Sequence, residues 1–203
     1  AFTVKALPHA LIPLYSGLIE ECIAPRLPMD SWTVAVACCE NASINLGEGL
    51  DIAQPGDILV VDVGQVTEEG PWGELTTIQA KIKGLAGLVI DGSVRDSLRI
   101  KEHGFPVFCK GVSVIGTAKE TVGYINHPIC CGNTIVKPGD IILADEDGVV
   151  VIPLAEAEEI LKKCQERVAK EDKMIERMRA GESLFAMGGF QEILDRKGCQ
   201  EED

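Results

Sequence analysis

An arginine and an aspartate stand side by side at Arg95 and Asp96, after a glycine-containing turn at the end of residues typical of a buried strand. An arginine can hold a carboxylate or an enolate oxygen, and an adjacent carboxylate can hold a hard divalent cation. Magnesium binds through one or two carboxylates and keeps several waters, so a single protein ligand is sufficient. An Arg-Asp pair is also common in surface salt bridges, so by itself it indicates metal chemistry without deciding it.

A second candidate site precedes the first at the start of a helix predicted over residues 74–83, which Gly84 closes. The amides that begin this helix belong to Gly73, Glu74, Leu75 and Thr76. These N–H groups lack partners within the helix and lie at its positive end, which is typical of a carboxylate or phosphate site. Every helix has such a start, so the pattern gains weight only from the charged pair that follows it.

The elements that must position these groups are mostly short strands, separated by Gly, Pro and Asp. They are predicted over residues 33–38, 57–62, 86–91, 106–110, 121–125, 141–144 and 148–153. Only the helix over 74–83, with Leu75, Ile78 and Ile82 on one face, clearly interrupts them before residue 154. The sequence therefore predicts a sheet-rich α/β fold without the regular strand-helix alternation of a doubly wound sheet.

Two segments resemble each other, PGDILVVD at residues 55–62 and PGDIILAD at residues 138–145. Each places a Pro-Gly-Asp turn before a buried strand that ends in aspartate. This similarity indicates either two related halves of a sheet or the same turn chemistry used twice.

Helices are predicted at both ends of the chain. Residues 9–22, within a lead-in over 1–30, show helical spacing of apolar residues, and residues 154–180 form a charged, proline-free segment typical of a long helix. Along the second helix the apolar stripe steps by threes and fours and is interrupted by Glu171. Either Glu171 is solvated, or the helix docks on a neighbour and presents this carboxylate to a polar site. At 203 residues, we expect a single domain, 1–203.

The composition argues against two classes of partner and for reduced thiols. A formal net charge of -13 repels nucleic acid and anionic membranes, so neither is an expected partner. The eight cysteines include two adjacent pairs and no C-x-x-C motif, and no signal peptide is evident. We therefore expect reduced, mostly buried thiols and a cytoplasmic protein.

Three runs carry a resemblance to a known family: GELTTIQAKIKGLAGLVIDGSVRD, FPVFCKG and GYINHPICCGNTIVKPGDIILADEDGVVVIP. In this order they resemble the family of 4-hydroxy-4-methyl-2-oxoglutarate aldolases and the regulator of ribonuclease activity A. The similarity extends from about residue 33 to the end of the chain. The family also has an older label, demethylmenaquinone methyltransferase, but this sequence has no glycine-rich cofactor loop of the usual kind.

The resemblance implies a role for each candidate residue. The aldolase branch has an acidic residue, twenty intervening residues and then Arg-Asp, a pattern met by Glu74 and Arg95, with glutamate in place of the usual aspartate. By this resemblance Gly73, Glu74, Leu75 and Thr76 would bind the pyruvyl carboxylate, Arg95 the 2-oxo group and Asp96 a divalent metal, with Mg²⁺ expected and Mn²⁺ as an alternative. A homotrimer or homohexamer would complete the site with Glu171, or else Asp172, of a neighbouring subunit. The implied fold is a β/β/α domain similar to the phosphohistidine swivelling domain.

The implied activity is that of a metal-dependent lyase that releases pyruvate. It would cleave 4-hydroxy-4-methyl-2-oxoglutarate-like acids by a retro-aldol reaction, decarboxylate oxaloacetate, or both. The base for the 4-hydroxyl group would be a metal-bound water held by Glu74 or by a neighbour's Glu171. Two alternatives remain: a non-catalytic regulator resembling the ribonuclease E inhibitor, and a phosphohistidine carrier, for which His127 is the candidate.

Overall fold

The computed structural model describes residues 12–13, 35–38, 43–64, 67–118, 123–145 and 147–199. The chain divides into two compact units, Ala1–Ala155 and Glu156–Asp203. The single domain that the sequence predicts over residues 1–203 stays a prediction.

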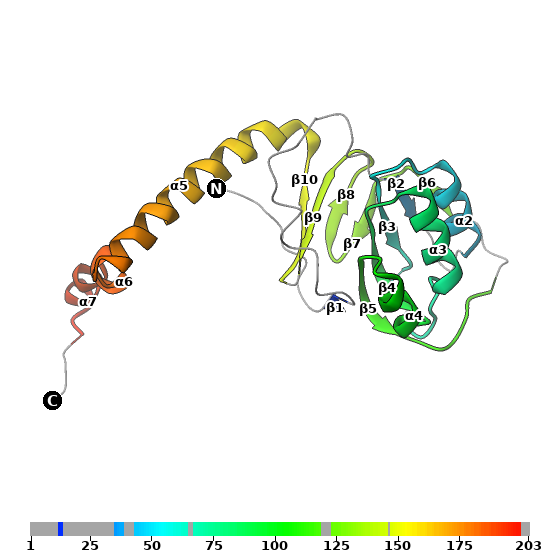
Figure 1. Ribbon diagram of the computed structural model, residues 1–203, viewed down its shortest axis with the longest axis horizontal. Helices are drawn as coiled ribbons and strands as arrows, with labels where there is room; N and C mark the ends of the chain where they lie inside the picture. The colour runs from blue at the N-terminus through cyan, green and yellow to red at the C-terminus, as the bar shows by residue number, and fades with distance from the viewer. Residues whose placement is uncertain are drawn as a thin grey trace. The chain divides into compact units, whose positions relative to one another are not determined.

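A six-stranded sheet forms the centre of the first unit (Figure 1). Its four inner strands run parallel, and they are β2 (Ala35–Cys38), β3 (Ile58–Asp62), β4 (Gly87–Val94) and β5 (Val107–Val112). The short strands β1 (Ile12–Pro13) and β6 (Tyr124–Ile125) lie antiparallel at the two edges, in the order β1-β5-β4-β3-β2-β6. All the parallel strands therefore end at the same edge of the sheet, where ligands commonly bind in α/β proteins.

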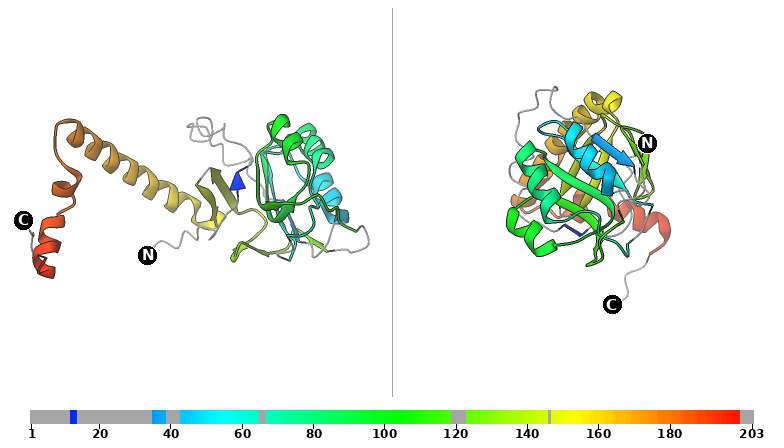
Figure 2. Two further views of the ribbon diagram at one scale, coloured as in Figure 1. Left: turned by 90° about the horizontal axis from the view of Figure 1, so that it is seen from below. Right: turned by 90° about the vertical axis from the view of Figure 1, so that its right-hand side faces the viewer.

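Helices connect the consecutive parallel strands and cover one face of the sheet (Figures 1 and 2). They are α2 (Ser43–Ile52), α3 (Glu74–Lys83) and α4 (Ser97–His103). The expectation of no regular alternation was therefore wrong, because α2 restores it. The sequence of α2 does not predict a helix, since Gly47 and Gly49 lower the helix propensity. Burial of Leu46 and Leu50 offsets that cost.

The core under these helices joins apolar residues of the sheet to α2, α4 and Trp72. From α3 it receives Thr77 and Ala80, which are fully buried, whereas Leu75 and Ile82 are 78% and 81% exposed. The apolar face that the sequence shows on this helix is therefore not its buried face. The buried face of α3 therefore carries small side chains.

Two hairpins face the opposite side of the sheet (Figure 2). They are formed by β7 (Ile129–Cys131) with β8 (Thr134–Val136), and by β9 (Ile141–Asp145) with β10 (Gly148–Ile152). Their buried residues pack on Val60, Val89 and Phe108, which alternate along β3, β4 and β5 with the residues that face the helices. This α/β arrangement confirms the fold class. The hairpin β7–β8 was not predicted, because strands of three residues carry too little pattern.

The repeated Pro-Gly-Asp segments share a turn and not a fold. In both, the aspartate N–H donates to the carbonyl three residues earlier, and the aspartate Oδ2 accepts the N–H of that same residue at 2.8 Å. Gly56 and Gly139 both have φ near +90°, at 91° and 89°, as a type II turn requires. However, β3 is an inner strand of the parallel sheet and β9 belongs to a hairpin. Of the two interpretations, the structure supports turn chemistry used twice.

One other expectation is wrong, and the expectation of mostly buried thiols is met by two of the five cysteines whose burial is known. The helix predicted over residues 9–22 is wrong at Ile12 and Pro13, which form a strand paired with β5; the remainder of the 1–30 lead-in lies outside the described residues. Among the described free cysteines only Cys109 and Cys131 are buried, while Cys130, Cys164 and Cys199 are exposed. Burial raises the pKa of Cys109 to about 11, so this thiol is a poor nucleophile at neutral pH.

The second unit is helical. It consists of α5 (Ala157–Arg179), α6 (Leu184–Met187) and α7 (Phe190–Lys197), and the one-turn helix η1 (Leu154–Glu156) precedes α5 at the boundary of the two units. The long helix expected over residues 154–180 is thus confirmed. None of the helices within the described ranges is both long and apolar enough to span a bilayer.

The burial pattern predicts which apolar residues stabilise the fold. Replacing the fully buried Leu50 with alanine should lower the free energy of unfolding by about 2–5 kcal/mol, because it leaves a cavity under α2. The matched change Ile82→Ala, at an exposed position of α3, should alter it by less than about 0.5 kcal/mol. Urea denaturation followed by circular dichroism measures both. Equal losses from the two variants would contradict the assignment of α2 to the core.

Candidate functional site

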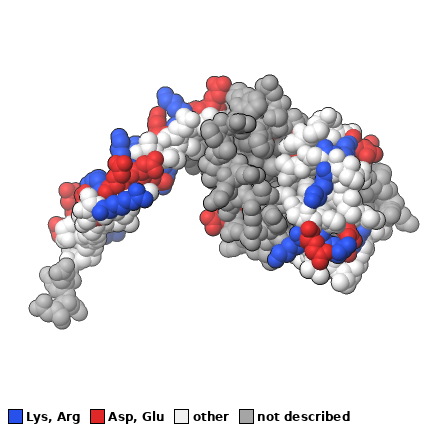
Figure 3. Space-filling model, in the orientation of Figure 1, with Lys and Arg blue, Asp and Glu red and all other residues white. Residues whose placement is uncertain are grey.

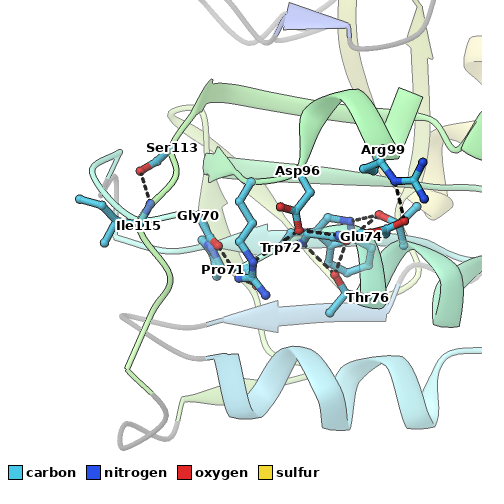
Figure 4. Close-up of polar contacts among 12 residues, drawn as sticks. Gly70, Pro71, Trp72, Glu74, Thr76, Asp96, Arg99, Ser113 and Ile115 are labelled. Atoms are coloured by element: carbon cyan, nitrogen blue, oxygen red, sulfur yellow. Dashed lines mark hydrogen bonds and ion pairs between the residues drawn. The ribbon is translucent and has the colours of Figure 1, made fainter. Parts of the chain in front are cut away.

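Arg95 and Asp96 follow the last residue of β4, and a short segment before α3 lies alongside them. Trp72 pairs in parallel with Val94, the final residue of β4, and the Arg95 N–H donates to the Trp72 carbonyl at 2.8 Å. The Trp72 ring is anchored because its Nε1 donates to the buried Thr77 Oγ1 at 2.8 Å. The strand end and the helix start, which are 21 residues apart in the sequence, therefore meet (Figure 4).

Asp96 adopts a left-handed backbone conformation, with φ 55° and ψ 33°, and is the N-cap residue of α4. Such a conformation is uncommon outside glycine and is found at functional sites more often than elsewhere. It turns the carboxylate toward the start of α3, where Oδ2 accepts the Glu74 N–H at 3.1 Å (Figure 4). Oδ1 has no hydrogen-bond partner within the described chain, and the side chain is 45% exposed.

The donors at the start of α3 are partly used by the protein itself. The Gly73 N–H donates to Thr76 Oγ1 at 3.0 Å, and the Glu74 N–H is bound by Asp96. The N–H groups of Leu75 and Thr76 have no acceptor among the residues that the structure describes. Two of the four amides expected at an anion pocket therefore remain for a ligand, at the positive end of the helix.

Gly73 lies where the Asp96 carboxylate, the Arg95 side chain and the amides that begin α3 come together. A Cβ atom built on it would lie 2.6 Å from Asp96 Oδ2 and 2.9 Å from Arg95 Cγ and Nε. Any side chain here would displace both charged residues, so their approach to the helix start depends on glycine.

One nitrogen of the Arg95 guanidinium is bound by the backbone, and another remains available. Its Nη1 donates to the Gly70 carbonyl at 2.8 Å, and its Nε lies 3.7 Å from Asp96 Oδ2, too far for a strong ion pair. Within the described ranges no acceptor contacts Nη2. The guanidinium is therefore oriented by a backbone carbonyl and retains donors for a ligand oxygen.

The Glu74 carboxylate points to α4 instead of to Arg95. Its Oε1 accepts a hydrogen bond from Arg99 Nε at 2.9 Å and lies 3.2 Å from His103 Nε2. Arg99 also pairs with Glu102, and these two partners, Glu102 first, raise the pKa of Arg99. The grouping of Glu74 with Arg99 and His103 was not predicted from the sequence. The only available signal was that Arg99 and His103 are one turn apart on α4.

The donor set fits a hard divalent cation. Asp96 offers an exposed carboxylate oxygen, and Mg²⁺ binds in this way when waters and ligand oxygens complete its shell. The described residues contain no group of three or more His, Cys, Asp or Glu side chains that could form a metal cage. A cation at Asp96 would therefore have most of its positions open to waters and to a ligand.

A buried charged group, Asp91 with its partners, has a structural role in the sheet. Asp91 is 1% exposed, forms an ion pair with Lys110 and accepts the Gly132 N–H at 2.8 Å. Asp62 lies beside it on β3, and burial, with a further contribution from the Asp91 charge, raises the pKa of Asp62. These contacts fasten the turn of the β7–β8 hairpin to the sheet.

Glu171 belongs to the second unit, on α5. Its Oε1 accepts a hydrogen bond from Arg167 Nε at 2.7 Å, one helical turn earlier. The proposed role of Glu171, or of Asp172, in completing a neighbour's site stays a prediction.

The family model "RraA-like: Aldolase/RraA" matches residues 22–151, more than half of the chain. The chain belongs to this family. The match ends in β10, so α5, α6 and α7 lie beyond it.

The similar proteins include enzymes and inhibitors by name. A protein of Halalkalibacterium halodurans named "Putative 4-hydroxy-4-methyl-2-oxoglutarate aldolase" is 36% identical over 140 residues, 69% of this chain and 66% of that protein. The chain thus spans slightly less than two thirds of this relative's length. Among solved structures, RraAS2 of Streptomyces coelicolor, a member of the RNase ES inhibitor RraA family, has a TM-score of 0.63 at 30% identity, over 70% of this chain and 74% of its own. The RNA-processing inhibitor RraA of Thermus thermophilis has a TM-score of 0.54 at 28% identity, over 60% and 73%.

These likenesses support the α/β fold with a parallel sheet and the recognition of the family. Aldolase names among the relatives place lyases in this family. The similarity to the phosphohistidine swivelling domain stays a prediction.

The close contact at Gly73 predicts a site-specific effect. Gly73→Ala should displace Arg95 and Asp96 and weaken the binding of oxalate, a small dicarboxylate, in the presence of Mg²⁺ by about 10- to 100-fold, the value of one charged hydrogen bond. Isothermal titration calorimetry measures this affinity.

A second glycine provides the matched control. No atom lies within 4 Å of a Cβ built on Gly47 in α2, so Gly47→Ala should leave the affinity for oxalate unchanged. It should also stabilise the helix by about 0.5–1 kcal/mol. Unchanged oxalate binding in Gly73→Ala would show that the helix start is not the binding site.

Proposed function

We propose that this protein is a divalent-metal-dependent lyase that releases pyruvate from a small 2-oxo acid. The observation that carries the proposal is the meeting of three groups around Gly73: the Asp96 carboxylate, the Arg95 guanidinium and the free N–H groups of Leu75 and Thr76. Together they match an anionic substrate with a neighbouring oxo group. The aldolase names among relatives agree with this chemistry.

The chain's own residues would bind the substrate at two points. The amides of Leu75 and Thr76, at the positive end of α3, would donate to the carboxylate of the pyruvyl group. Arg95, held by the Gly70 carbonyl, would donate from Nη2 to the 2-oxo oxygen. Both contacts orient the substrate so that its C3–C4 bond can break with the electrons passing toward the 2-oxo group.

Charge stabilisation is the main catalytic contribution of these residues. A divalent cation held by Asp96, with Mg²⁺ expected and Mn²⁺ as an alternative, would supply Lewis-acid polarisation of the substrate oxygens. Breaking the C3–C4 bond places negative charge on the 2-oxo oxygen as an enolate forms, and Arg95 would stabilise that charge. A preorganised donor of this kind typically contributes about 3–4 kcal/mol.

The two reactions differ in their need for a base. Retro-aldol cleavage of 4-hydroxy-4-methyl-2-oxoglutarate requires removal of the 4-hydroxyl proton, whereas loss of carbon dioxide from oxaloacetate does not. Glu74 would have to act through a water, because its carboxylate is bound by Arg99 and lies near His103. A neighbour's Glu171 is the alternative that the family resemblance implies. Protonation at C3 then yields pyruvate in both reactions.

Exposed apolar residues around the site support an assembly of several copies. Leu75 and Leu98, in the first turns of α3 and α4, and Val114, after β5, are all largely exposed. Apolar surface next to a functional site is typical of an interface. We therefore propose a homotrimer or homohexamer with the site at the subunit boundary. We further propose a cytoplasmic protein that binds neither nucleic acid nor membranes.

The metal ligand gives the first test. Asp96→Asn should lower kcat/KM for pyruvate release from oxaloacetate by about 10²-fold or more, since it removes the charge that holds the cation. A chelator should have the same effect on the unaltered protein, and added Mg²⁺ should restore activity. Asp147→Asn, in the exposed β9–β10 turn, is the control and should leave activity unchanged. Full turnover without metal would exclude the proposal.

The base gives the second test. Glu74→Gln should reduce retro-aldol cleavage by about 10²–10⁴-fold if Glu74 assists the base, while decarboxylation of oxaloacetate should persist. Glu171→Gln should show the same split if a neighbour supplies this function. A coupled assay for pyruvate with each substrate measures both. Parallel losses on the two substrates would instead assign these residues to binding or structure.

A second function has support from the similar structures, because two of them are named as inhibitors of RNA processing or of RNase ES. In that case the fold would supply a protein-binding surface and the site would be unused. Inhibition of a ribonuclease E by the purified protein, unchanged in Asp96→Asn and without any pyruvate release, would favour this function over the lyase.

A further inference from the structure

The Glu74 carboxylate makes contacts that the start of a helix does not require. Thr76 already caps α3, because its Oγ1 accepts the Gly73 N–H at 3.0 Å and donates to the Gly73 carbonyl at 2.9 Å. Glu74 therefore has no capping role, and its side chain extends to α4 (Figure 4). There a single oxygen, Oε1, lies 2.9 Å from Arg99 Nε and 3.2 Å from His103 Nε2.

The second oxygen of this carboxylate stays available near the candidate metal ligand. Within the described ranges no side chain or backbone group contacts Glu74 Oε2, and the side chain is 28% exposed. The Glu74 backbone lies next to Asp96, since its N–H donates to Asp96 Oδ2 at 3.1 Å. A flexible glutamate side chain at this place can turn either to α4 or to a cation at Asp96.

Helix α4 is fixed firmly enough to hold a neighbouring side chain. Its residue Ile100 is fully buried in the core, and the Lys81 ammonium group of α3 donates to the His103 carbonyl. Arg99 is next to Ile100 and also pairs with Glu102 on its own helix. In Figure 3 acidic and basic side chains gather side by side over α4. The position of the Arg99 guanidinium is therefore set by an anchored helix.

A second carboxylate at the cation would change the site. Mg²⁺ accepts one or two protein carboxylates, and each takes a position that a water or a ligand oxygen could occupy. Glu74 is such a second carboxylate beside Asp96 unless a positive group draws it elsewhere. The Arg99 guanidinium does so through a charge-assisted hydrogen bond, and the His103 ring lies beside the same oxygen.

We propose that Arg99 is a positioning residue, which holds the Glu74 carboxylate on α4 and prevents it from becoming a second ligand of the cation at Asp96. The cation then keeps its open positions, and Glu74 Oε2 is left to hold the water that serves as base. This inference rests on the proposed lyase and deepens it. It assigns to Arg99 a role that acts through Glu74 and not through the substrate.

Metal affinity is the direct measurement. Arg99→Ala should increase the affinity of the full chain for Mg²⁺ alone by about 10-fold, because the freed Glu74 carboxylate joins Asp96 at the cation. Isothermal titration calorimetry measures this affinity without substrate. Arg99→Lys should retain the affinity of the unaltered protein, since an ammonium group can also donate to Glu74. An unchanged affinity in Arg99→Ala would overturn the proposal.

Two controls separate this effect from the loss of a positive charge near the site. Lys101→Ala removes a charge from the same helix, but Lys101 has no ion pair among the described residues, so the affinity should change by less than about twofold. In Arg99→Ala combined with Glu74→Gln the gain should disappear, because the carboxylate that would join the cation is absent. A gain that persists in this double variant would assign the effect to charge alone and overturn the proposal.

Turnover gives a readout that a merely structural role would not produce. Arg99→Ala should lower kcat for retro-aldol cleavage by about 10²-fold with little change in KM, because a displaced Glu74 no longer holds the water that acts as base. Decarboxylation of oxaloacetate, which needs no base, should persist. Equal losses in both reactions, or a change confined to KM, would contradict the positioning role.

The outcomes distinguish this inference from the proposed lyase. Mg²⁺ binding that depends on Asp96, without pyruvate release from either acid, would reject the lyase and leave the role of Arg99 to be decided by affinity. Pyruvate release that depends on Asp96, with equal Mg²⁺ affinities in Arg99→Ala and Lys101→Ala, would reject only the role of Arg99.

Discussion

The junction between the end of β4 and the start of α3 is the constraint on which the candidate site depends. It consists of the bridge from Trp72 to Val94, the hydrogen bond from the Arg95 N–H to the Trp72 carbonyl, and the close packing on Gly73. The strand end supplies the two charged side chains and the helix start supplies backbone donors. Because the junction is made by main-chain atoms and a buried tryptophan, the geometry of the site is set by the core and not by flexible side chains.

Much of the site could be predicted from the sequence, because it follows from local rules. A glycine before a helix, a strand and turn followed by Arg-Asp, and the spacing of these motifs are all visible in the residues. What could not be predicted is how the groups satisfy one another. The Asp96 carboxylate binds the Glu74 amide, which removes one donor from the expected pocket, and the Glu74 side chain turns to Arg99 and His103. These contacts are set by the tertiary packing of α3 against α4.

The fold, too, could be predicted from the sequence only in part. Strands with several β-branched residues were recognised, since their pattern is strong enough over five residues or more. Helix α2 was missed because two glycines weaken its local signal, and only the burial of Leu46 and Leu50 makes it a helix. On α3 the apolar residues Leu75 and Ile82 face outward, while Thr77 and Ala80 are its buried residues. In both cases the tertiary environment outweighs local preference.

The backbone of Asp96 shows that stability and chemistry require different residues at one position. A left-handed conformation costs a residue with a Cβ atom about 1 kcal/mol or more relative to glycine. Glycine or asparagine would therefore relax this turn, but only aspartate supplies a full negative charge there. If the site binds a cation, the chain keeps a locally less stable backbone because the charge is needed for function. Substitution of Asp96 without selection for function would then give a more stable and less active protein.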